Sequence, residues 1–248
     1  MPPQRAIILA AGYGSRMGAL TADRPKALLE IDGWSLIDRQ LDALHRCGID
    51  DVTLVVGYQQ RRLREHLGNR VTFVVNPRYR SSNSLYSLWL AREMLAGGAV
   101  VMNADVVLAP ELLERLAWAP APDAVLIDDS KRTLGDEEMK VRLCQGFVID
   151  FSKQLGSRDA HGENVGVVKF GAEGARRLVH HLGVYVTEGH VQAWAPQAYR
   201  ALAQEWPLRA VSTCGLAWTE IDFPEDLERA RFEVVPAIVA RARERGAA

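Results

Sequence analysis

The residues best suited to chemistry follow the first apolar run of the sequence, residues 6–10. Three glycines come directly after it: Gly12, Gly14 and Gly18. Glycine lets a backbone pass close to a ligand and adopt positive φ, and successive N–H groups in such a turn can converge on an anion. The Ser15 hydroxyl and the side chains of Arg16 and Lys26 add a further donor and two positive charges. These residue types in this order predict a site for a polyphosphate.

The glycine spacing alone does not identify the site. It is G-x-G-x-x-x-G, whereas the dinucleotide fingerprint requires G-x-G-x-x-G with an acidic residue about 20 positions later. No G-x-x-x-x-G-K-[ST] string follows, which excludes a P-loop. A tight strand-to-helix turn remains the alternative for the three glycines taken alone.

Two distant aspartates are candidate metal ligands. Asp105 follows the apolar segment 99–102, and Asp222 lies in the string WTEIDFPEDL after another apolar segment. Each also has a simpler interpretation, as a residue that begins or caps a helix. Because strands of one parallel sheet present their carboxyl ends at one edge, the two carboxylates can meet. Mg²⁺ bound with a nucleoside triphosphate takes one or two carboxylates plus phosphate oxygens, so the pair predicts a magnesium site.

The elements that must position these residues alternate between strands and helices. Beyond residues 6–10, apolar strands are expected at 52–56, 71–75, 99–102 and 124–127. Amphipathic or basic helices are expected between them, at 35–47, 59–67 and 84–95. This alternation predicts an α/β fold with a doubly wound, mostly parallel sheet. Residues 139–143, 146–151 and 165–170 predict a small antiparallel β appendage.

The strings LAAGYGSRMG and RPKALLEI together closely resemble the signature of the sugar-phosphate and alcohol-phosphate nucleotidyltransferases. These pyrophosphorylase-type enzymes join a nucleoside triphosphate to a phosphorylated acceptor and release pyrophosphate. The strings YRSSNSLYSL, EEMKV, GENVGV and WTEIDFPEDLERA extend the resemblance over nearly the whole chain. It is closest to bacterial CTP-dependent cytidylyltransferases that activate phosphocholine or phosphonates, including phosphonoformate.

The resemblance implies a single nucleotidyltransferase domain with a Rossmann-like sheet of GT-A type. The nucleotide-binding core would comprise about 1–130 and 206–235, and the acceptor-binding appendage about 131–205. The cofactor would be Mg²⁺, held by Asp105 and Asp222. The family often has D-G-D where this chain has Asn103-Ala104-Asp105, but the last acid of that string is the usual ligand.

The resemblance also assigns roles to single residues. Arg16 and Lys26 would be catalytic. Residues implied in nucleotide binding are Leu9, Ala10, Ala11, Gly12, Gly14, Ser15, Arg16, Lys26, Ser82, Asn83, Ser84, Asn103, Ala104 and Asp105. Residues implied in acceptor binding are Arg80, Lys140, Lys153, Glu163, Trp194 and Glu220.

The acceptor is the least constrained part of the expected reaction. Choline and aminoethylphosphonate enzymes of this type usually carry acidic residues at the start of the helix after the appendage, whereas residues 192–198 here read QAWAPQA. The family pattern also places three cations, Arg80, Lys140 and Lys153, near the acceptor. The missing acids and these cations together favour a compact anionic acceptor such as phosphonoformate. Trp194 could still contact a cation through its ring, so phosphocholine and aminoethylphosphonate remain open. Two alternatives are a sugar-1-phosphate enzyme using UTP, GTP or dTTP, and a non-catalytic nucleotide-binding module.

Composition limits the other classes of partner. The 248 residues carry a net charge of −1, so no overall field draws the chain to nucleic acid or to an anionic membrane. No apolar run approaches the roughly 18 residues of a membrane span, and the first residues lack a signal-peptide pattern. The three cysteines lack metal-ligand spacing. We therefore expect a cytoplasmic enzyme, monomeric or homodimeric, that uses CTP and a small anionic acceptor.

Overall fold

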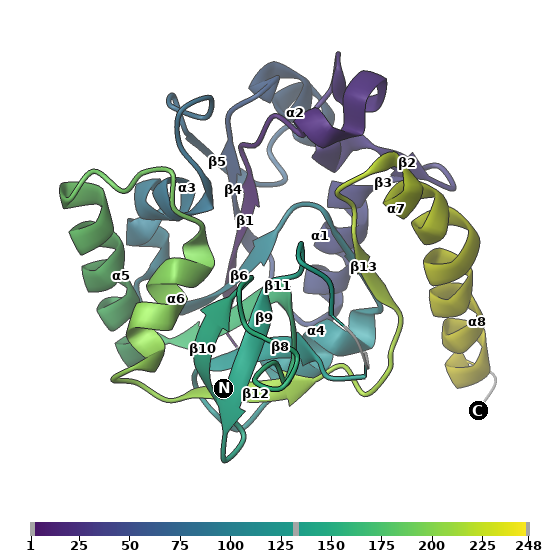
Figure 1. The fold of residues 1–248 in the computed structure, drawn as a ribbon. Helices are drawn as coiled ribbons and strands as arrows, with labels where there is room; N and C mark the ends of the chain where they lie inside the picture. Colours follow the sequence, from purple (N-terminus) through teal and green to yellow (C-terminus); the bar gives the residue numbers. More distant parts are fainter. Residues whose placement is uncertain (1–2, 131–133, 247–248) are drawn as a thin grey trace.

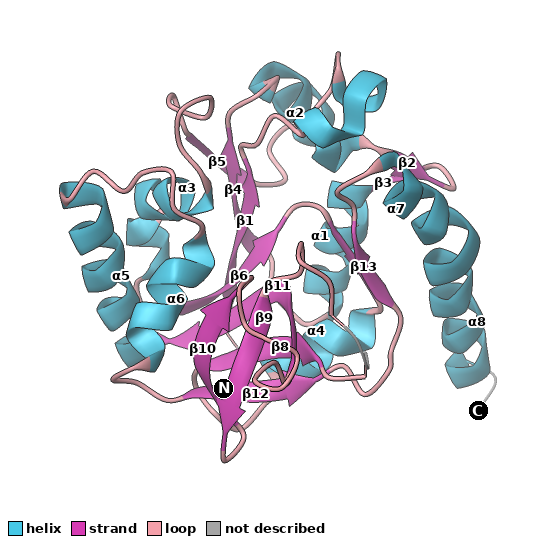
Figure 2. Cartoon of the chain, in the orientation of Figure 1, coloured by secondary structure: helices cyan, strands magenta, loops and turns pink. Residues whose placement is uncertain are grey.

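A computed structural model describes residues 3–130 and 134–246. It contains a nine-stranded sheet with the order β5-β4-β1-β6-β11-β8-β12-β10-β9 (Figures 1 and 2). Its strands are β1 (Arg5–Ala10), β4 (Asp51–Val56), β5 (Thr72–Val75), β6 (Gly98–Asn103), β8 (Ala124–Asp128), β9 (Lys140–Cys144), β10 (Phe147–Ser152), β11 (Gly162–Gly171) and β12 (Leu208–Ser212). Two short ribbons lie beside it: β2 (Glu30–Ile31) with β3 (Trp34–Ser35), and β7 (Val106–Leu108) with β13 (Trp218–Glu220).

Helices cover both faces of this sheet. The helices on the sheet are α1 (Leu36–Arg46), α2 (Gln60–Leu67), α3 (Ser84–Leu90), α4 (Pro110–Ala117), α5 (Ala172–Thr187) and α6 (Ala195–Ala203), and α7 (Pro224–Arg229) and α8 (Val235–Gly246) lie to one side of it. Helices α3, α5 and α6 pack together on one face, and α1 and α4 pack together on the other (Figure 1). Within the described ranges, no helix has both the length and the apolar character needed to cross a bilayer.

The apolar residues of β1 are buried on both sides of the sheet. Ile8 belongs to a core cluster that includes Leu44 of α1, whereas Ile7 belongs to another that includes Leu85 of α3. Successive side chains of a strand point to opposite faces, and a parallel strand covered on both faces is apolar throughout. The expected α/β layers are therefore confirmed.

The later strands are antiparallel as predicted, but their place in the fold differs from expectation. Strands β4, β1 and β6 run parallel, but β11 lies antiparallel between β6 and β8. The sheet is therefore mixed, and residues 165–170, which were expected in a small appendage, form part of its middle. An apolar run indicates that a strand is buried on both faces, but it does not indicate which strands lie beside it. The predicted domain boundary at residue 131 falls on a position outside the described residues.

Gly57 follows β4 and is packed too closely for a side chain. A Cβ there would lie 2.5 Å from Tyr79 Cβ and 2.7 Å from the Ala11 carbonyl oxygen. Gly57→Ala is expected to push these segments apart and to lower the free energy of unfolding by about 1–3 kcal/mol, the usual effect of overpacking. Chemical denaturation would measure the loss. Gly156→Ala is the control, because an added Cβ there meets nothing within 4 Å. Equal unfolding free energies in the two variants would contradict the expectation.

Candidate active site

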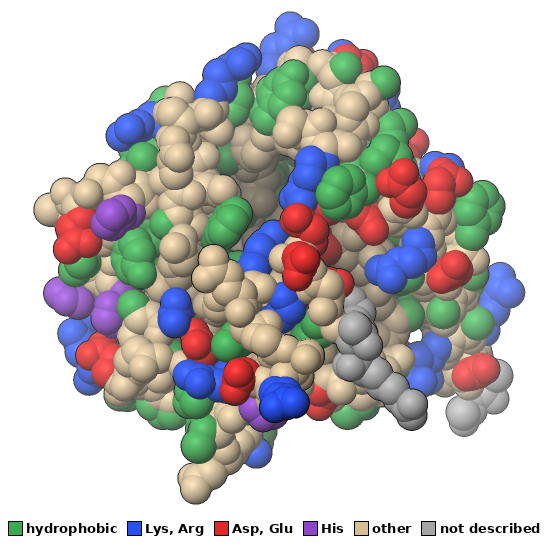
Figure 3. Space-filling view, viewed as in Figure 1, with side chains coloured by type: hydrophobic (Ala, Val, Ile, Leu, Met, Phe, Trp, Pro, Cys, Tyr) green, Lys and Arg blue, Asp and Glu red, His purple; other side chains and the backbone are tan. Residues whose placement is uncertain are grey.

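A cavity of about 350 Å³ opens where β1 and β6 end. Figure 3 shows the hollow on this face of the molecule, with acidic and basic side chains gathered along one side of it. The cavity is lined by all the residues expected to bind nucleotide: Leu9, Ala10, Ala11, Gly12, Gly14, Ser15, Arg16, Lys26, Ser82, Asn83, Ser84, Asn103, Ala104 and Asp105. Segments far apart in the sequence therefore meet around one space.

The glycine loop that follows β1 forms one wall of the cavity. Gly14 has φ 65°, in the left-handed region that favours glycine. Its carbonyl oxygen accepts hydrogen bonds from the Met17 N–H at 3.0 Å and from the Thr21 hydroxyl at 2.9 Å. These bonds fold the chain back on itself, so that Gly14 packs against the stem of Lys26. The loop thus fixes the position of the lysine that follows it.

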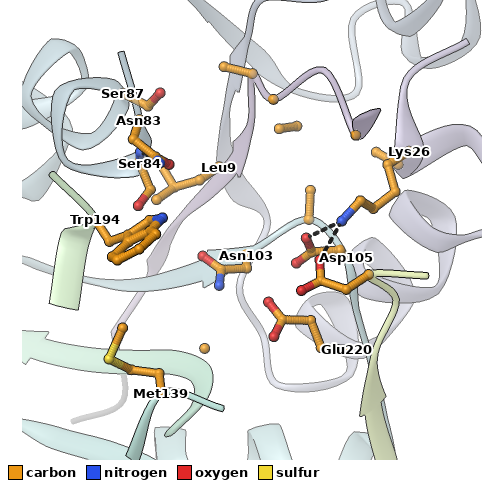
Figure 4. Close-up of a pocket in the computed structure, with 18 of the residues that line it drawn as sticks. Leu9, Lys26, Asn83, Ser84, Ser87, Asn103, Asp105, Met139, Trp194 and Glu220 are labelled. Atoms are coloured by element: carbon orange, nitrogen blue, oxygen red, sulfur yellow. Dashed lines mark hydrogen bonds and ion pairs between the residues drawn. The ribbon is translucent and has the colours of Figure 1, made fainter. Parts of the chain in front are cut away.

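Lys26 lies between two carboxylates. Its Nζ is 2.9 Å from Asp105 Oδ2 (Figure 4) and 2.9 Å from Asp222 Oδ1. The side chain is only 16% exposed. Burial opposes the charged form, but the two carboxylates outweigh it and raise the pKa of Lys26 above its ordinary value. The lysine is therefore a fixed cation at this edge of the cavity.

Three carboxylates gather around that cation. One oxygen from each of Asp105, Glu220 and Asp222 lies within 4.8 Å of the other two. Burial, together with the charges of Asp105 and Asp222, raises the pKa of Glu220 to about 8. The β7–β13 ribbon produces this meeting, because Glu220 pairs with Val106 and the Ile221 N–H donates to the Asp105 carbonyl oxygen at 2.9 Å.

The same carboxylates fit a divalent cation. Among the described side chains, Asp105 Oδ1 is buried and has no hydrogen-bond partner. Carboxylate oxygens are the protein ligands that Mg²⁺ prefers. The helix-capping interpretation of Asp222 does not hold, because the Asp226 carboxylate accepts from the N–H groups of Asp222 and Phe223 at 2.9 and 2.8 Å at the start of α7. The Asp222 side chain instead lines the cavity.

Glu137 joins two cations at the rim of the cavity and was missed by the sequence analysis. Its Oε2 lies 3.3 Å from Arg16 Nη1 and 3.2 Å from Lys153 Nζ. Arg16 also reaches Asp222 Oδ2 at 2.8 Å. Lys153 Nζ lies 5.2 Å from the centre of the Trp194 ring. Glu137 stands in an acidic run, which in a sequence looks like an ordinary solvated turn, so no local signal sets it apart.

The opposite wall of the cavity is polar and tightly bonded. Asn76 is 1% exposed, and its Nδ2 donates to the hydroxyls of Ser82 and Ser87 at 3.0 Å each. Ser84 Oγ accepts from the Ala195 N–H at 2.8 Å, which ties the start of α3 to the start of α6. Figure 4 shows Asn83, Ser84 and Trp194 across the cavity from Lys26 and Asp105. Asn76 and Ser87 were not predicted.

Three of the residues expected to bind the acceptor, Lys153, Trp194 and Glu220, line the cavity, but three do not. Arg80 is exposed, and its Nε donates to the Tyr79 hydroxyl at 3.2 Å. Lys140 is 4% exposed, and its Nζ donates to the Lys153 carbonyl oxygen at 2.6 Å. Glu163 is 6% exposed in β11, where it pairs with Asp128 and Lys140. These three positions are corrections to the sequence analysis: the first points to the surface, and the other two are held within the sheet.

Comparison with known proteins places the chain among nucleotide-handling enzymes. A family described as the MobA-like NTP transferase domain matches residues 6–211. CMP-5'-(3-aminopropyl)phosphonate synthase of Streptomyces rubellomurinus is 31% identical over 94% of this chain and 39% of its own length. CTP:phosphoglutamine cytidylyltransferase of Campylobacter jejuni is 27% identical over 90% of this chain and 97% of its own length. The chain thus spans about two fifths of the first relative and nearly all of the second.

A solved structure supports the same grouping. The CTP:phosphocholine cytidylyltransferase of Streptococcus pneumoniae superimposes with a TM-score of 0.75 at 26% identity. The match covers 92% of this chain and 97% of that one. The likeness extends over the parallel and the antiparallel strands together.

Proposed function

The chain belongs to the MobA-like NTP transferase domain family, and from this premise we propose that it transfers CMP from CTP to a small phosphonate or phosphate acceptor with release of pyrophosphate. One observation carries the proposal. Lys26 meets Asp105 and Asp222 at 2.9 Å each, in a cavity whose lining includes the glycine loop. A non-catalytic nucleotide-binding module would have no need of this arrangement of charges.

In the proposed reaction, an oxygen of the acceptor's phosphate or phosphonate group attacks the α-phosphorus of CTP in line. A P–O bond forms, the bond from the α-phosphorus to the bridging oxygen breaks, and pyrophosphate leaves with that electron pair. The attacking oxygen is already anionic, so no general base is required. Catalysis then depends on positioning and on charge stabilisation.

Different residues would supply the positioning and the charge stabilisation. Arg16 and the N–H groups of the glycine loop would hold the β- and γ-phosphates as they leave. Lys26 would neutralise charge on the α-phosphate and draw the acceptor oxygen towards it. Asp105 and Asp222, with Glu220 beside them, would hold Mg²⁺. When bound, Mg²⁺ would offset the charge that develops on the phosphate oxygens.

The rim of the cavity favours an anionic acceptor such as phosphonoformate. Lys153 already places an ammonium group 5.2 Å from the centre of the Trp194 ring, where a substrate ammonium would otherwise bind. Glu137, which could balance a substrate amine, is paired with Arg16 and Lys153. The relatives are named for different acceptors: aminopropylphosphonate, phosphoglutamine and phosphocholine. Their names therefore do not identify the group that the acceptor of this chain carries beside its phosphate or phosphonate.

A pyrophosphate-release assay tests the proposal directly. CTP, UTP, GTP and dTTP would each be combined with phosphonoformate, phosphocholine, 2-aminoethylphosphonate and glucose 1-phosphate. We expect release with CTP and a phosphonate or choline-type acceptor, and the highest kcat/KM with phosphonoformate. Release only with a sugar 1-phosphate would replace the proposal with its closest alternative. Nucleotide binding without release in any combination would favour the non-catalytic module.

Lys153→Ala is expected to change acceptor preference. Removing its ammonium costs an anionic acceptor one charged hydrogen bond, about 1.5–3 kcal/mol or roughly 10–150-fold in kcat/KM. The Trp194 face is freed at the same time, so the loss should be smaller with phosphocholine. The measurement is kcat/KM for phosphonoformate and phosphocholine in each variant. Arg158→Ala removes an exposed cation outside the cavity lining and serves as the control. An equal loss of kcat/KM for both acceptors would show that Lys153 does not contact the part of the acceptor that differs between them.

A further inference from the structure

Gln40 is buried behind the turn that carries Asp105. It belongs to α1, is 2% exposed and is absent from the cavity lining. Its Nε2 donates to the carbonyl oxygens of Asn103 and Val106, at 2.8 Å each. One carbonyl lies two residues before Asp105 and the other lies directly after it. A single amide group therefore spans the turn from outside the cavity.

Other contacts also hold the turn, because Asn103 pairs with Leu9 of β1 and Val106 pairs with Glu220 of β13. The Ala104 N–H donates to the Leu9 carbonyl oxygen at 3.2 Å, and the Asp105 carbonyl oxygen accepts from the Ile221 N–H at 2.9 Å. The first bond ties the turn to β1, and the second ties it to the segment that follows β13. The Gln40 amide joins the two sides of the turn directly, because it bonds both the end of β6 and the start of β7.

The position of the Gln40 side chain leaves its amide oxygen without a hydrogen bond. Gln40 Oε1 is buried, and among the described side chains it belongs to the few oxygen atoms with no hydrogen-bond partner. A buried unpaired carbonyl oxygen opposes folding, so the amide is held for its two N–H bonds and not for its oxygen. The helix itself is firmly anchored, since the Leu36, Ile37 and Leu44 side chains are fully buried.

We propose that Gln40 is a positioning residue that sets the Asp105 carboxylate against Lys26 and Asp222. It touches no substrate. It acts through the backbone of residues 103–106, holding Asp105 Oδ2 at 2.9 Å from Lys26 Nζ and Oδ1 free of partners. The inference rests on the proposed function. It implies that α1, through Gln40, contributes to the affinity of the site for a divalent cation that binds together with a nucleotide.

Gln40→Met tests this assignment, because methionine keeps the length and approximate volume of the side chain but donates no hydrogen bond. Calorimetry would give the Kd of CTP in Mg²⁺ and in EDTA, with no acceptor and hence no turnover. In the unaltered protein, Mg²⁺ is expected to tighten CTP binding. In Gln40→Met, we expect about a tenfold weaker Kd in Mg²⁺ and an unchanged Kd in EDTA, with kcat lowered to a similar degree in the pyrophosphate assay.

Two further variants separate positioning from stability. Leu44→Ala makes a cavity beside the same helix but removes neither of the hydrogen bonds that Gln40 donates to residues 103–106, and it should keep the Mg²⁺-dependent part of CTP binding even where its unfolding temperature falls as far. Gln40→Asn keeps the amide on a shorter side chain and should be intermediate, which also covers the case in which Gln40→Met does not fold. An unchanged Mg²⁺ effect in Gln40→Met or Gln40→Asn, or an equal loss in Leu44→Ala, would overturn the inference. If the unaltered protein binds no CTP, or binds it equally in Mg²⁺ and in EDTA, the proposed function fails and this inference fails with it.

Discussion

Lys26→Ala is expected to abolish measurable pyrophosphate release while the fold survives. Loss of one preorganised charge contact typically lowers the rate by ~10²–10³, and Lys26 is the cation placed between the Asp105 and Asp222 carboxylates. The variant should remain folded, because Lys26 lies at the edge of the cavity and not in a core cluster. Pyrophosphate release with CTP and the best acceptor measures the first effect, and circular dichroism measures the second.

The same substitution has a second consequence that depends on the metal. Without Lys26, the carboxylates of Asp105 and Asp222 lose the ammonium group that lies 2.9 Å from each, while Glu220 still offers an oxygen within 4.8 Å of both. Like charges so close repel each other, so the variant should unfold at a lower temperature in EDTA and recover part of the loss in Mg²⁺. Lys26→Met keeps most of the aliphatic stem and should be equally inactive, which separates charge from packing. Near-normal turnover in either variant would refute the role of Lys26.

The glycine loop and the cations that follow it could be placed at the cavity from the sequence because their signals are local. Gly14, Arg16 and Lys26 lie within one short stretch, and the loop that they form is fixed by bonds inside that stretch. The resemblance to a known family indicated the other residues expected to bind nucleotide, and the structure places them in the lining of the same cavity.

Asp105 and Asp222 come together as expected, but by a different route. They were expected at the carboxyl ends of strands in one sheet. In the structure, β13 pairs with β7 in a separate two-stranded ribbon, and that ribbon carries Glu220 and Asp222 to the Asp105 turn. Strand-end position is a sound guide to proximity, whereas the pairing partner of a three-residue strand has no signal in its sequence.

The acceptor side could be predicted only in part, because its contacts join distant segments through single side chains. Glu137 meets Arg16 from 121 positions away. Lys140 looked like a second cation for the acceptor, yet it is buried against the Lys153 carbonyl oxygen. The period of a strand indicates which residues share a face, but not which neighbour takes a long side chain. Gln40 illustrates the same limit, since its two partners lie 63 and 66 residues away.

Asp222→Asn is expected to lower kcat/KM by ~10²–10³ and to remove most of the response to Mg²⁺. The asparagine keeps the shape of the side chain but loses the charge that faces both Lys26 and Arg16, at 2.9 and 2.8 Å. A neutral amide is also a poorer ligand than a carboxylate for a hard cation. The measurement is a titration of Mg²⁺ at fixed CTP and acceptor, read as pyrophosphate release.

The control for this variant is the neighbouring acid at the start of α7. Asp226→Asn weakens the bonds to the N–H groups of Asp222 and Phe223, so it should lower the unfolding temperature by more than Asp222→Asn does. It should nevertheless keep the Mg²⁺ response, because Asp226 is outside the cavity lining. A normal Mg²⁺ titration in Asp222→Asn would mean that the Asp105 and Glu220 carboxylates suffice to hold the cation. The role of Asp222 would then be confined to orienting Lys26 and Arg16.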